Sequence, residues 1–212
     1  MHFILAGTES DDFLYDIPFG TIKRPAMDLD VPGLTYACAL PDEQPALAII
    51  SREKYGYRCT DEYMSLTLIR SSSDPDPFPE LFRHRFTFHV AMPAQTDAGY
   101  LAALSKRLCH PAFSRSVTAH AGTLPAQNTL MACDAAVSGV KLAEDGTGDI
   151  IIRLYEETGT ARDAALSLPA DTAKTACLCS LTEVPGEALT VSGGNITVPL
   201  PAHGIVTVRV RR

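Results

Sequence analysis

The chain has 212 residues, a length that fits one large or two small domains and is sufficient to bury a hydrophobic core. Hydrophobic residues make up 46% of it, and the formal net charge is −7, with lysine and arginine scattered along the sequence. These values are typical of a folded globular protein. They argue against a disordered chain and against a nucleic-acid-binding protein, which needs a clustered basic surface.

The sequence also argues against membrane insertion and secretion. No apolar run approaches the roughly 20 residues of a membrane-spanning helix. The short apolar segment 1–7 lacks the basic residues that open a signal peptide, so we expect a strand there. Six irregularly spaced cysteines are typical of free thiols in a reducing compartment. We therefore expect a cytoplasmic, bacterial protein, in which the sequon at Asn195 has no role.

The first half of the chain has short apolar runs separated by Gly and Pro, a pattern typical of β-sandwiches. Strands are predicted at residues 47–50, 63–69 and 85–90. In the last of these, Phe86 and Phe88 share a face. Residues 71–79 contain three prolines, which cannot donate to a strand ladder, and this segment is therefore predicted to be a loop.

One short helix is predicted at residues 96–108. Leu101, Leu104 and Leu108 recur at helical spacing, and Asp97 stands near the start of the segment. Residues 110–131 are polar, rich in small residues and without clear periodicity. They are predicted to connect two β domains.

The β pattern returns in the second half of the chain. About seven strands are predicted, in a compact sandwich; they include residues 137–142, 149–156, 164–168, 173–181, the two arms of a hairpin at 189–198, and 205–210. The hairpin turns at Gly193 and Gly194. Glu156 and Glu157 end a strand and are predicted to be solvated.

Several segments, in this order and spacing, carry a resemblance to a known family. They are residues 16–25 (ending in Arg-Pro), 54–57 (Lys-Tyr-Gly-Tyr), 65–77 (with Leu-Ile-Arg and Asp-Pro-Asp-Pro), 84–88, 139–146 and 150–156. Together they resemble the C-terminal β-domain region of glycoside hydrolase family 38, the retaining α-mannosidases, over roughly residues 15–212. Arg58, Glu80 and Cys109 depart from the family pattern, as does the lack of tryptophan, and these departures indicate a divergent branch.

The resemblance implies a fold and a division into domains. The fold class is mainly β: the end of a galactose-mutarotase-like β-supersandwich followed by a small C-terminal β-sandwich, with one short helix. The supersandwich part is expected at residues 1–109, the connector at 110–131 and the terminal sandwich at 132–212.

The resemblance also implies an accessory role. In the family, the zinc ligands and the nucleophilic Asp lie in a separate N-terminal domain, and nothing in this sequence resembles that domain. We therefore expect no metal or cofactor in this chain and zinc in the catalytic domain. The full enzyme would hydrolyse α-mannosides through a covalent intermediate, while this chain alone would be inactive. Its expected partners are its own catalytic domain, mannose-containing carbohydrate and, in a homo-oligomer, a second copy.

Tyr55, Tyr57 and Arg70 are the first candidates for a substrate pocket or interface. A tyrosine can stack on a sugar ring and an arginine can donate hydrogen bonds to its hydroxyls, and in the family loops of the β region lie near the active site. The alternative is core packing for the tyrosines and an interface ion pair for Arg70.

Asp76 and His84 complete the candidate set. Asp74 and Asp76 could be considered as the carboxylate pair of a retaining glycosidase, but Asp in a Pro-rich turn more commonly bonds its own backbone. His84 matches a family histidine and is expected to be a hydrogen-bonded structural residue. His84 and His89 should point to opposite faces of a strand, which disfavours a zinc pair.

Three alternatives remain open from the residues. The chain could be a stand-alone carbohydrate-binding module with an aromatic platform of Tyr55, Tyr57 or Tyr63. It could be a catalytic domain in its own right. Cys177 and Cys179 could form half of a metal site, although no second Cys/His pair stands at zinc-finger spacing.

Overall fold

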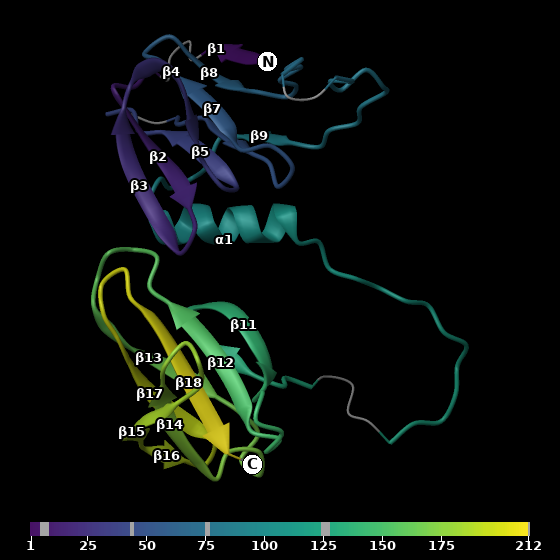
Figure 1. Ribbon diagram of the computed structural model, residues 1–212, viewed down its shortest axis with the longest axis vertical. Coiled ribbons are helices and arrows are strands. Elements are labelled where there is room, and N and C mark those ends of the chain that lie inside the picture. The colour runs from purple at the N-terminus through teal and green to yellow at the C-terminus, as the bar shows by residue number, and fades with distance from the viewer. Residues whose placement is uncertain (5–8, 43–44, 75–76, 124–127, 212) are drawn as a thin grey trace. The chain divides into compact units, whose positions relative to one another are not determined.

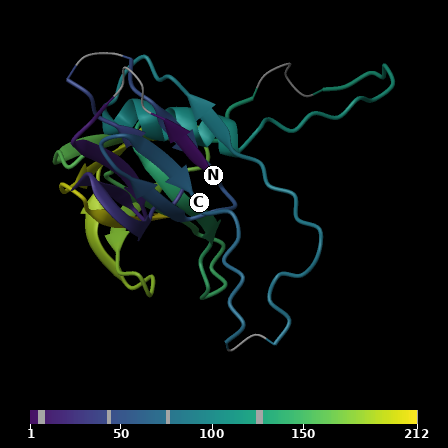
Figure 2. The ribbon, with the colours of Figure 1, turned by 90° about the horizontal axis from the view of Figure 1, so that it is seen from above.

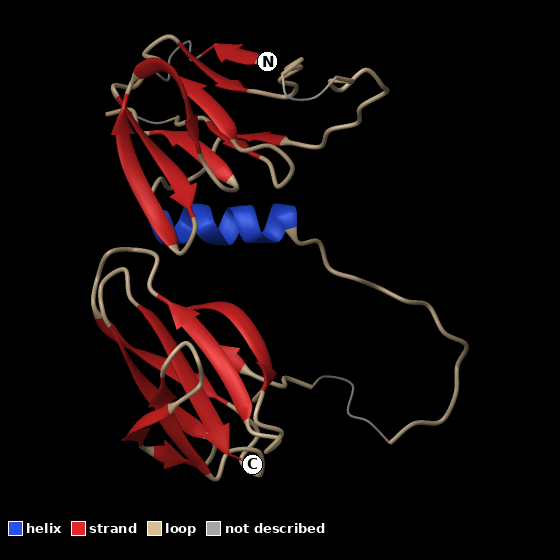
Figure 3. Cartoon of the chain, viewed as in Figure 1, coloured by secondary structure: helices blue, strands red, loops and turns tan. Residues whose placement is uncertain are grey.

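The computed structural model describes residues 1–212 except 5–8, 43–44, 75–76, 124–127 and 212. The chain forms two compact units, Met1–Phe113 and Ser114–Arg212 (Figure 1). Both are built mainly from antiparallel strands, and the described residues contain one helix, α1 (Ala98–Cys109), in the first unit (Figure 3). The prediction of a mainly β chain with one short helix is confirmed.

The first unit contains two antiparallel sheets. A four-stranded sheet has the order β1 (His2–Ile4), β8 (Tyr63–Leu66), β7 (Gly56–Cys59) and β4 (Met27–Pro32). A five-stranded sheet has the order β3 (Gly20–Pro25), β2 (Asp12–Ile17), β5 (Tyr36–Ala39), β6 (Ala48–Ile50) and β9 (His89–Ala91).

The central strand β5 shows why the first unit has three layers. All four of its residues are buried. Ala37 and Ala39 pack in a core that also contains Tyr57 and Leu66 of the four-stranded sheet. Tyr36 and Cys38 point the other way and pack in a second core with residues of α1. Because successive side chains alternate between the two faces of a strand, the five-stranded sheet is covered by a sheet on one side and by the helix on the other.

Helix α1 begins where the sequence predicts. The Asp97 carboxylate accepts a hydrogen bond of 2.9 Å from the Tyr100 backbone N–H, which satisfies one of the free donors of the first turn. Leu101 and Cys109 face the sheet, so the apolar stripe of the helix is the buried one.

The second unit is a sandwich of two sheets. The five-stranded sheet has the order β11 (Ala136–Leu142), β12 (Ile150–Tyr155), β18 (Ile205–Arg211), β14 (Thr175–Cys179) and β15 (Pro185–Leu189). The four-stranded sheet has the order β10 (Ala132–Cys133), β13 (Arg162–Ser167), β17 (Asn195–Leu200) and β16 (Val191–Ser192).

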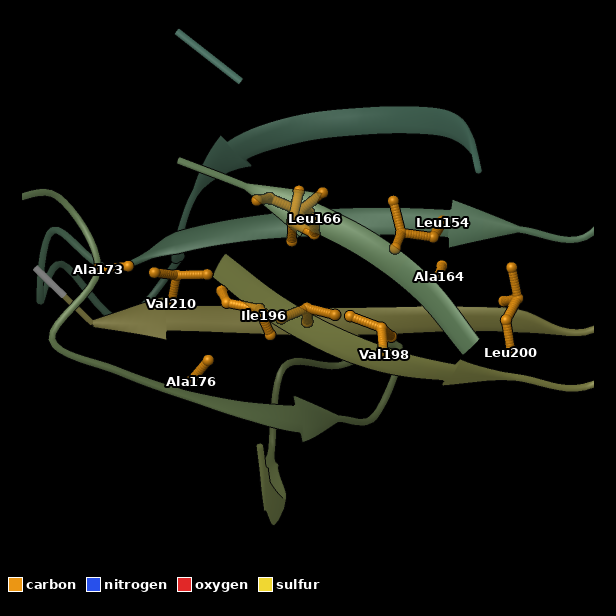
Figure 4. Packing of buried hydrophobic residues seen from close by; sticks show 11 residues of the cluster. Leu154, Ala164, Leu166, Ala173, Ala176, Ile196, Val198, Leu200 and Val210 are labelled. Carbon is orange, nitrogen blue, oxygen red and sulfur yellow. The ribbon is translucent and has the colours of Figure 1, made fainter. Parts of the chain in front are cut away.

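A single apolar core fills this sandwich. Figure 4 shows Leu154 and Val210 of one sheet packed with Leu166, Ile196 and Val198 of the other. The core residues alternate with outward-facing ones along β17, as expected for a strand with one buried face.

The strand prediction at residues 85–90 is wrong for most of its length. Only β9, which begins at His89, is a strand, and β8 ends at Leu66 rather than at residue 69. The Thr87 N–H donates to the Glu53 carboxylate at 3.2 Å, so a side chain takes the donor that a ladder would use. The loop between β8 and β9, blue in Figure 2, extends away from the sheets of the first unit.

The second half contains more strands than predicted. Nine are found in the described part of residues 132–212, because β10 and β15 add to the seven expected, while β16 and β17 are the two arms of the predicted hairpin. Along the sequence, the boundary between the two compact units lies between residues 113 and 114. In the segment 110–131, the residues that the structure describes form neither helix nor strand. No helix in the described ranges is long and apolar enough to cross a membrane.

Candidate functional site

Tyr55 lines an apolar pocket of about 310 Å³ in the first unit. The other lining residues are Ile17 and Pro18 at the end of β2, and Pro32, Gly33 and Leu34 at the end of β4. Two backbone hydrogen bonds hold these segments together: the Gly33 N–H donates to the Tyr55 carbonyl at 2.9 Å, and the Leu34 N–H donates to the Asp16 carbonyl at 2.7 Å. The pocket is therefore built on the ends of strands rather than on a free loop.

The chemistry of the Tyr55 pocket is apolar. Its lining contains no charged side chain. The one side-chain hydroxyl of the lining, on Tyr55, donates to the Arg52 carbonyl at 3.1 Å, while the residue remains 54% exposed. A sugar needs several donors and acceptors for its hydroxyls, whereas an aliphatic or aromatic side chain needs none. This pocket fits an apolar side chain of a protein surface better than it fits a sugar.

Gly33 is required by the packing below the pocket. A Cβ at this position would lie 2.9 Å from two ring carbons of Tyr57. Tyr57 itself is fully buried in the first core, and its hydroxyl has no hydrogen-bond partner among the described residues. Burial raises the pKa of Tyr57. Tyr57 is thus a core residue and contributes no exposed ring to an aromatic platform.

Arg70 and His84 lie in the long loop between β8 and β9, and Glu80 links them. The Arg70 backbone N–H donates to the Glu80 carboxylate at 3.1 Å, and His84 Nε2 lies 2.9 Å from the Glu80 carbonyl oxygen. The His84 ring also packs between Phe82 and Phe86, at centroid distances of 4.5 and 5.5 Å. His84 therefore has structural contacts within its own loop.

The other candidates do not join this cluster. Asp74 is exposed, and its backbone carbonyl accepts a hydrogen bond of 2.8 Å from the Ser72 hydroxyl. Asp76 lies outside the described residues. Tyr63 donates to the Asp28 carboxylate at 3.3 Å, on the four-stranded sheet. The structure thus brings Arg70 and His84 together, and it places Tyr55 in a separate pocket.

The prediction that Glu156 is solvated is wrong, because this residue is only 2% exposed. Its carboxylate accepts hydrogen bonds from the backbone N–H groups of Thr158, Gly159, Thr160 and His203 and from the Thr158 hydroxyl. Burial opposes its ionisation, but these donors outweigh burial and lower the pKa of Glu156 to about 2. Glu156 is an anchor for two loops rather than an acid–base catalyst.

A polar cluster on the second unit was missed by sequence reasoning. Arg209 donates from Nε to Asp149 at 2.8 Å and from Nη2 to Asp145 at 2.7 Å. Arg209 Nη2 also donates to the Thr147 hydroxyl at 3.0 Å. The alternation of residues 205–210 places Arg209 on the face opposite the valines. It does not predict an ion-pair partner 60 residues away in the sequence.

The possible metal ligands among the described residues are dispersed. Among them, no three His, Cys, Asp or Glu side chains are grouped so as to hold a metal ion. Cys177 and Cys179 are free and partly buried. The zinc expected in a separate catalytic domain remains a prediction.

Two family models match the chain. Residues 6–78 match the model described as the glycosyl hydrolases family 38 C-terminal domain. Residues 134–208 match the model described as the glycosyl hydrolases family 38 C-terminal beta sandwich domain. The two matches fall one in each compact unit.

Two curated proteins are similar to the chain. Alpha-mannosidase G of Dictyostelium discoideum is 27% identical in an alignment of 162 residues, which covers 69% of this chain and 14% of that protein. Alpha-mannosidase 2C1 of Homo sapiens is 28% identical in an alignment of 216 residues, which covers 86% of this chain and 19% of that protein. The chain therefore spans less than a fifth of the length of these relatives.

Solved structures share the fold. An alpha-mannosidase from Enterococcus faecalis V583 superimposes with a TM-score of 0.69 at 18% identity, over 95% of this chain and 24% of that one. A protein in glycosyl hydrolase family 38 from Enterococcus faecalis gives the same TM-score over 96% of this chain and 25% of that one. The sequence segments, the two family models and the fold agree, and the chain belongs to the C-terminal region of glycoside hydrolase family 38.

Proposed function

We propose that this chain is the non-catalytic C-terminal β region of a retaining, zinc-dependent α-mannosidase. In this proposal the zinc ligands and the nucleophile lie in an N-terminal catalytic domain of the same polypeptide. The names of the curated relatives and the matches of both compact units to family 38 C-terminal domains support this proposal.

The observation that carries the accessory role is the Tyr55 pocket. Its lining is apolar, and Leu34 and Tyr55 remain exposed at 37% and 54%. Exposed apolar concavities of this kind are typical of protein–protein contacts. The proposed occupant is an apolar side chain of the catalytic domain, and the proposed effect is to hold that domain in its active arrangement.

The first test compares two proteins in aryl α-mannoside hydrolysis with added zinc. They are the longest open reading frame that contains this chain, and the chain alone. We expect activity in the longer protein and none in the chain. Activity in the chain alone would overturn the proposal and would direct attention to Asp74, Asp76 and His84.

The second test uses variants of the longer protein. Leu34→Asp places a charge in the Tyr55 pocket and should reduce α-mannosidase activity by about tenfold or more, since an unpaired buried charge costs over about 1.4 kcal/mol. Leu29→Asp is the matched control, because Leu29 is 61% exposed on β4 and does not line the pocket. Equal activity in both variants would contradict a docking role for the pocket.

Three expectations from the sequence remain predictions. They are a cytoplasmic location in a bacterium, assembly into a homo-oligomer, and zinc in the catalytic domain. Gel filtration with light scattering measures the second, and metal analysis of the longer protein measures the third.

A further inference from the structure

A groove of about 730 Å³ lies on the second unit, far in sequence from the Tyr55 pocket. Its lining combines polar and small apolar residues: Thr147, Asp149, Thr175, Ala176, Cys177, Pro185, Ala188, Arg209 and Arg211. Small-molecule sites in proteins enclose about 300–1,000 Å³ and place a few polar groups among apolar ones. The groove has both properties.

Strand register places the groove on the outer face of the five-stranded sheet. Thr175 pairs with Arg211, and Cys177 pairs with Arg209 on one side and Ala188 on the other. The intervening residues Val208 and Val210 are buried in the sandwich core. Because side chains alternate along a strand, the paired residues point away from the core and form the floor of the groove.

One wall of the groove is held rigidly. Arg209 binds both Asp149 and Asp145, and the side chains of Arg209 and Asp149 are only 11% and 12% exposed. The Thr147 hydroxyl donates to the Asp145 carboxylate at 2.7 Å, which closes the turn between β11 and β12 onto Arg209. A ligand would therefore meet polar groups that are already oriented, and little side-chain entropy would be lost on binding.

Several polar groups of the groove remain available. Within the described part of the chain, no side chain or backbone group bonds to the Arg211 guanidinium, the Thr175 hydroxyl or the Asp149 Oδ1. Arg211 can only donate, the carboxylate can only accept, and the hydroxyl can do both. These three groups would therefore pair with a ligand that carries hydrogen-bond donors and acceptors side by side.

The charges of the groove select against an ion. Arg209 and Arg211 are balanced by Asp149 and by Asp145 next to it, so the formal sum is zero. An anion near Arg211 would also meet the Asp149 carboxylate, and a cation near Asp149 would meet Arg211. Pro185 and Ala188 add an apolar surface that fits the C–H face of a sugar ring. We propose that this groove binds a neutral carbohydrate of one or two sugar rings, with Arg211, Thr175 and Asp149 as its hydrogen-bond partners.

This site goes beyond the accessory role and is independent of it. A sugar site on the second unit would tether a glycan without taking part in hydrolysis. Loss of sugar binding leaves the α-mannoside assay of the longer protein as a separate test, so the two proposals can fail separately.

The test is a nitrogen-15 NMR titration of the whole chain with methyl α-D-mannoside and with a mannose disaccharide. We expect saturable shift changes at residues 175–177, 185–188 and 209–211. Inorganic phosphate is the parallel probe for an anion site. Saturable shifts with phosphate but not with either sugar would overturn the proposal, and so would the absence of saturable shifts at these residues with both sugars.

Variants assign the contacts. Arg211→Gln and Thr175→Val should each weaken sugar binding, the first by about tenfold, the factor expected for one charge-assisted hydrogen bond. Ala188→Trp should block the groove without removing any polar group. Arg58→Gln, on the surface of the first unit, is the control and should bind as the unaltered chain does. Unchanged affinity in all three groove variants, each shown to be folded by its NMR spectrum, would overturn the assignment.

Discussion

Glu156 is the residue whose environment departs most from its sequence pattern, and it yields the first prediction. Its carboxylate binds N–H groups of the loop at 158–160 and of His203. Replacement by Gln keeps the volume but removes the charge and one acceptor oxygen. Glu156→Gln should therefore lower the free energy of unfolding of the second unit by about 1–3 kcal/mol at pH 7, as measured by urea denaturation.

Urea denaturation at lower pH tests whether the charge of the Glu156 carboxylate provides this stability. Because hydrogen bonds hold the pKa of Glu156 at about 2, against the ordinary 4.5, the folded state gains stability above pH 4.5 and loses it as pH falls toward 2. The difference in unfolding free energy between Glu156→Gln and the unaltered chain should therefore shrink as the pH falls from 5 to 2. Glu187→Gln is the control, because Glu187 is exposed on β15. A difference that stays constant with pH would contradict this account.

For single residues, the sequence predicts burial correctly where it depends only on which face of a strand the side chain occupies. Alternation along the predicted strand at 205–210 puts Val206, Val208 and Val210 on one face, and Val208 and Val210 are fully buried. Glu156 escaped prediction because one of its donors, the His203 N–H, is 47 residues away. Tyr55 and Tyr57 likewise have similar sequence surroundings, and only the fold separates a pocket wall from a core residue.

At the scale of the element, the hairpin of β16 and β17 gives the second prediction. Its two-residue turn, Gly193 and Gly194, has φ values of 57° and 86°, the region that two-residue hairpins require and that side chains disfavour. A Cβ on Gly193 meets nothing within 4 Å, whereas one on Gly194 would lie 2.2 Å from the Leu168 carbonyl oxygen. Gly193→Ala should cost about 1 kcal/mol of unfolding free energy from backbone strain alone.

The neighbouring substitution separates strain from collision. Gly194→Ala should cost about 1–3 kcal/mol more than Gly193→Ala, since the Leu168 backbone must move. Thermal or urea unfolding of the two variants measures the difference directly. Equal losses would show that the segment around Leu168 yields freely, contrary to its hydrogen bond with Gly194.

Element prediction succeeded where the local signals were complete. The predicted helix at residues 96–108 appears as Ala98–Cys109, with its cap at Asp97 and its apolar stripe buried. The predicted strand at 85–90 failed, because alternation alone does not provide a neighbouring strand to pair with. The Phe86 ring instead stacks on His84 and lies 4.3 Å from Lys54 Nζ.

At the scale of the whole molecule, each compact unit has its own apolar core, which gives the third prediction. The residues described between 111 and 123 are exposed, and Arg115 lies among them. Limited trypsin digestion should cut at Arg115 and separate two parts that keep β-type circular dichroism. Each should unfold in its own cooperative transition, because burial within a unit decides its stability. Rapid cleavage at arginines within the strands, such as Arg153, would contradict the division into two folded units.

The buried tyrosines of the first unit give the chain a built-in optical label. It contains no tryptophan, and six of its seven tyrosines precede residue 114. Near-ultraviolet absorbance and fluorescence therefore report almost entirely on the first unit, with Tyr155 as the single tyrosine signal of the second. Burial also raises the pKa of Tyr15 and Tyr57. In alkaline solution their phenolate absorbance would appear only when the first unit opens, so a spectrophotometer alone distinguishes which unit has unfolded.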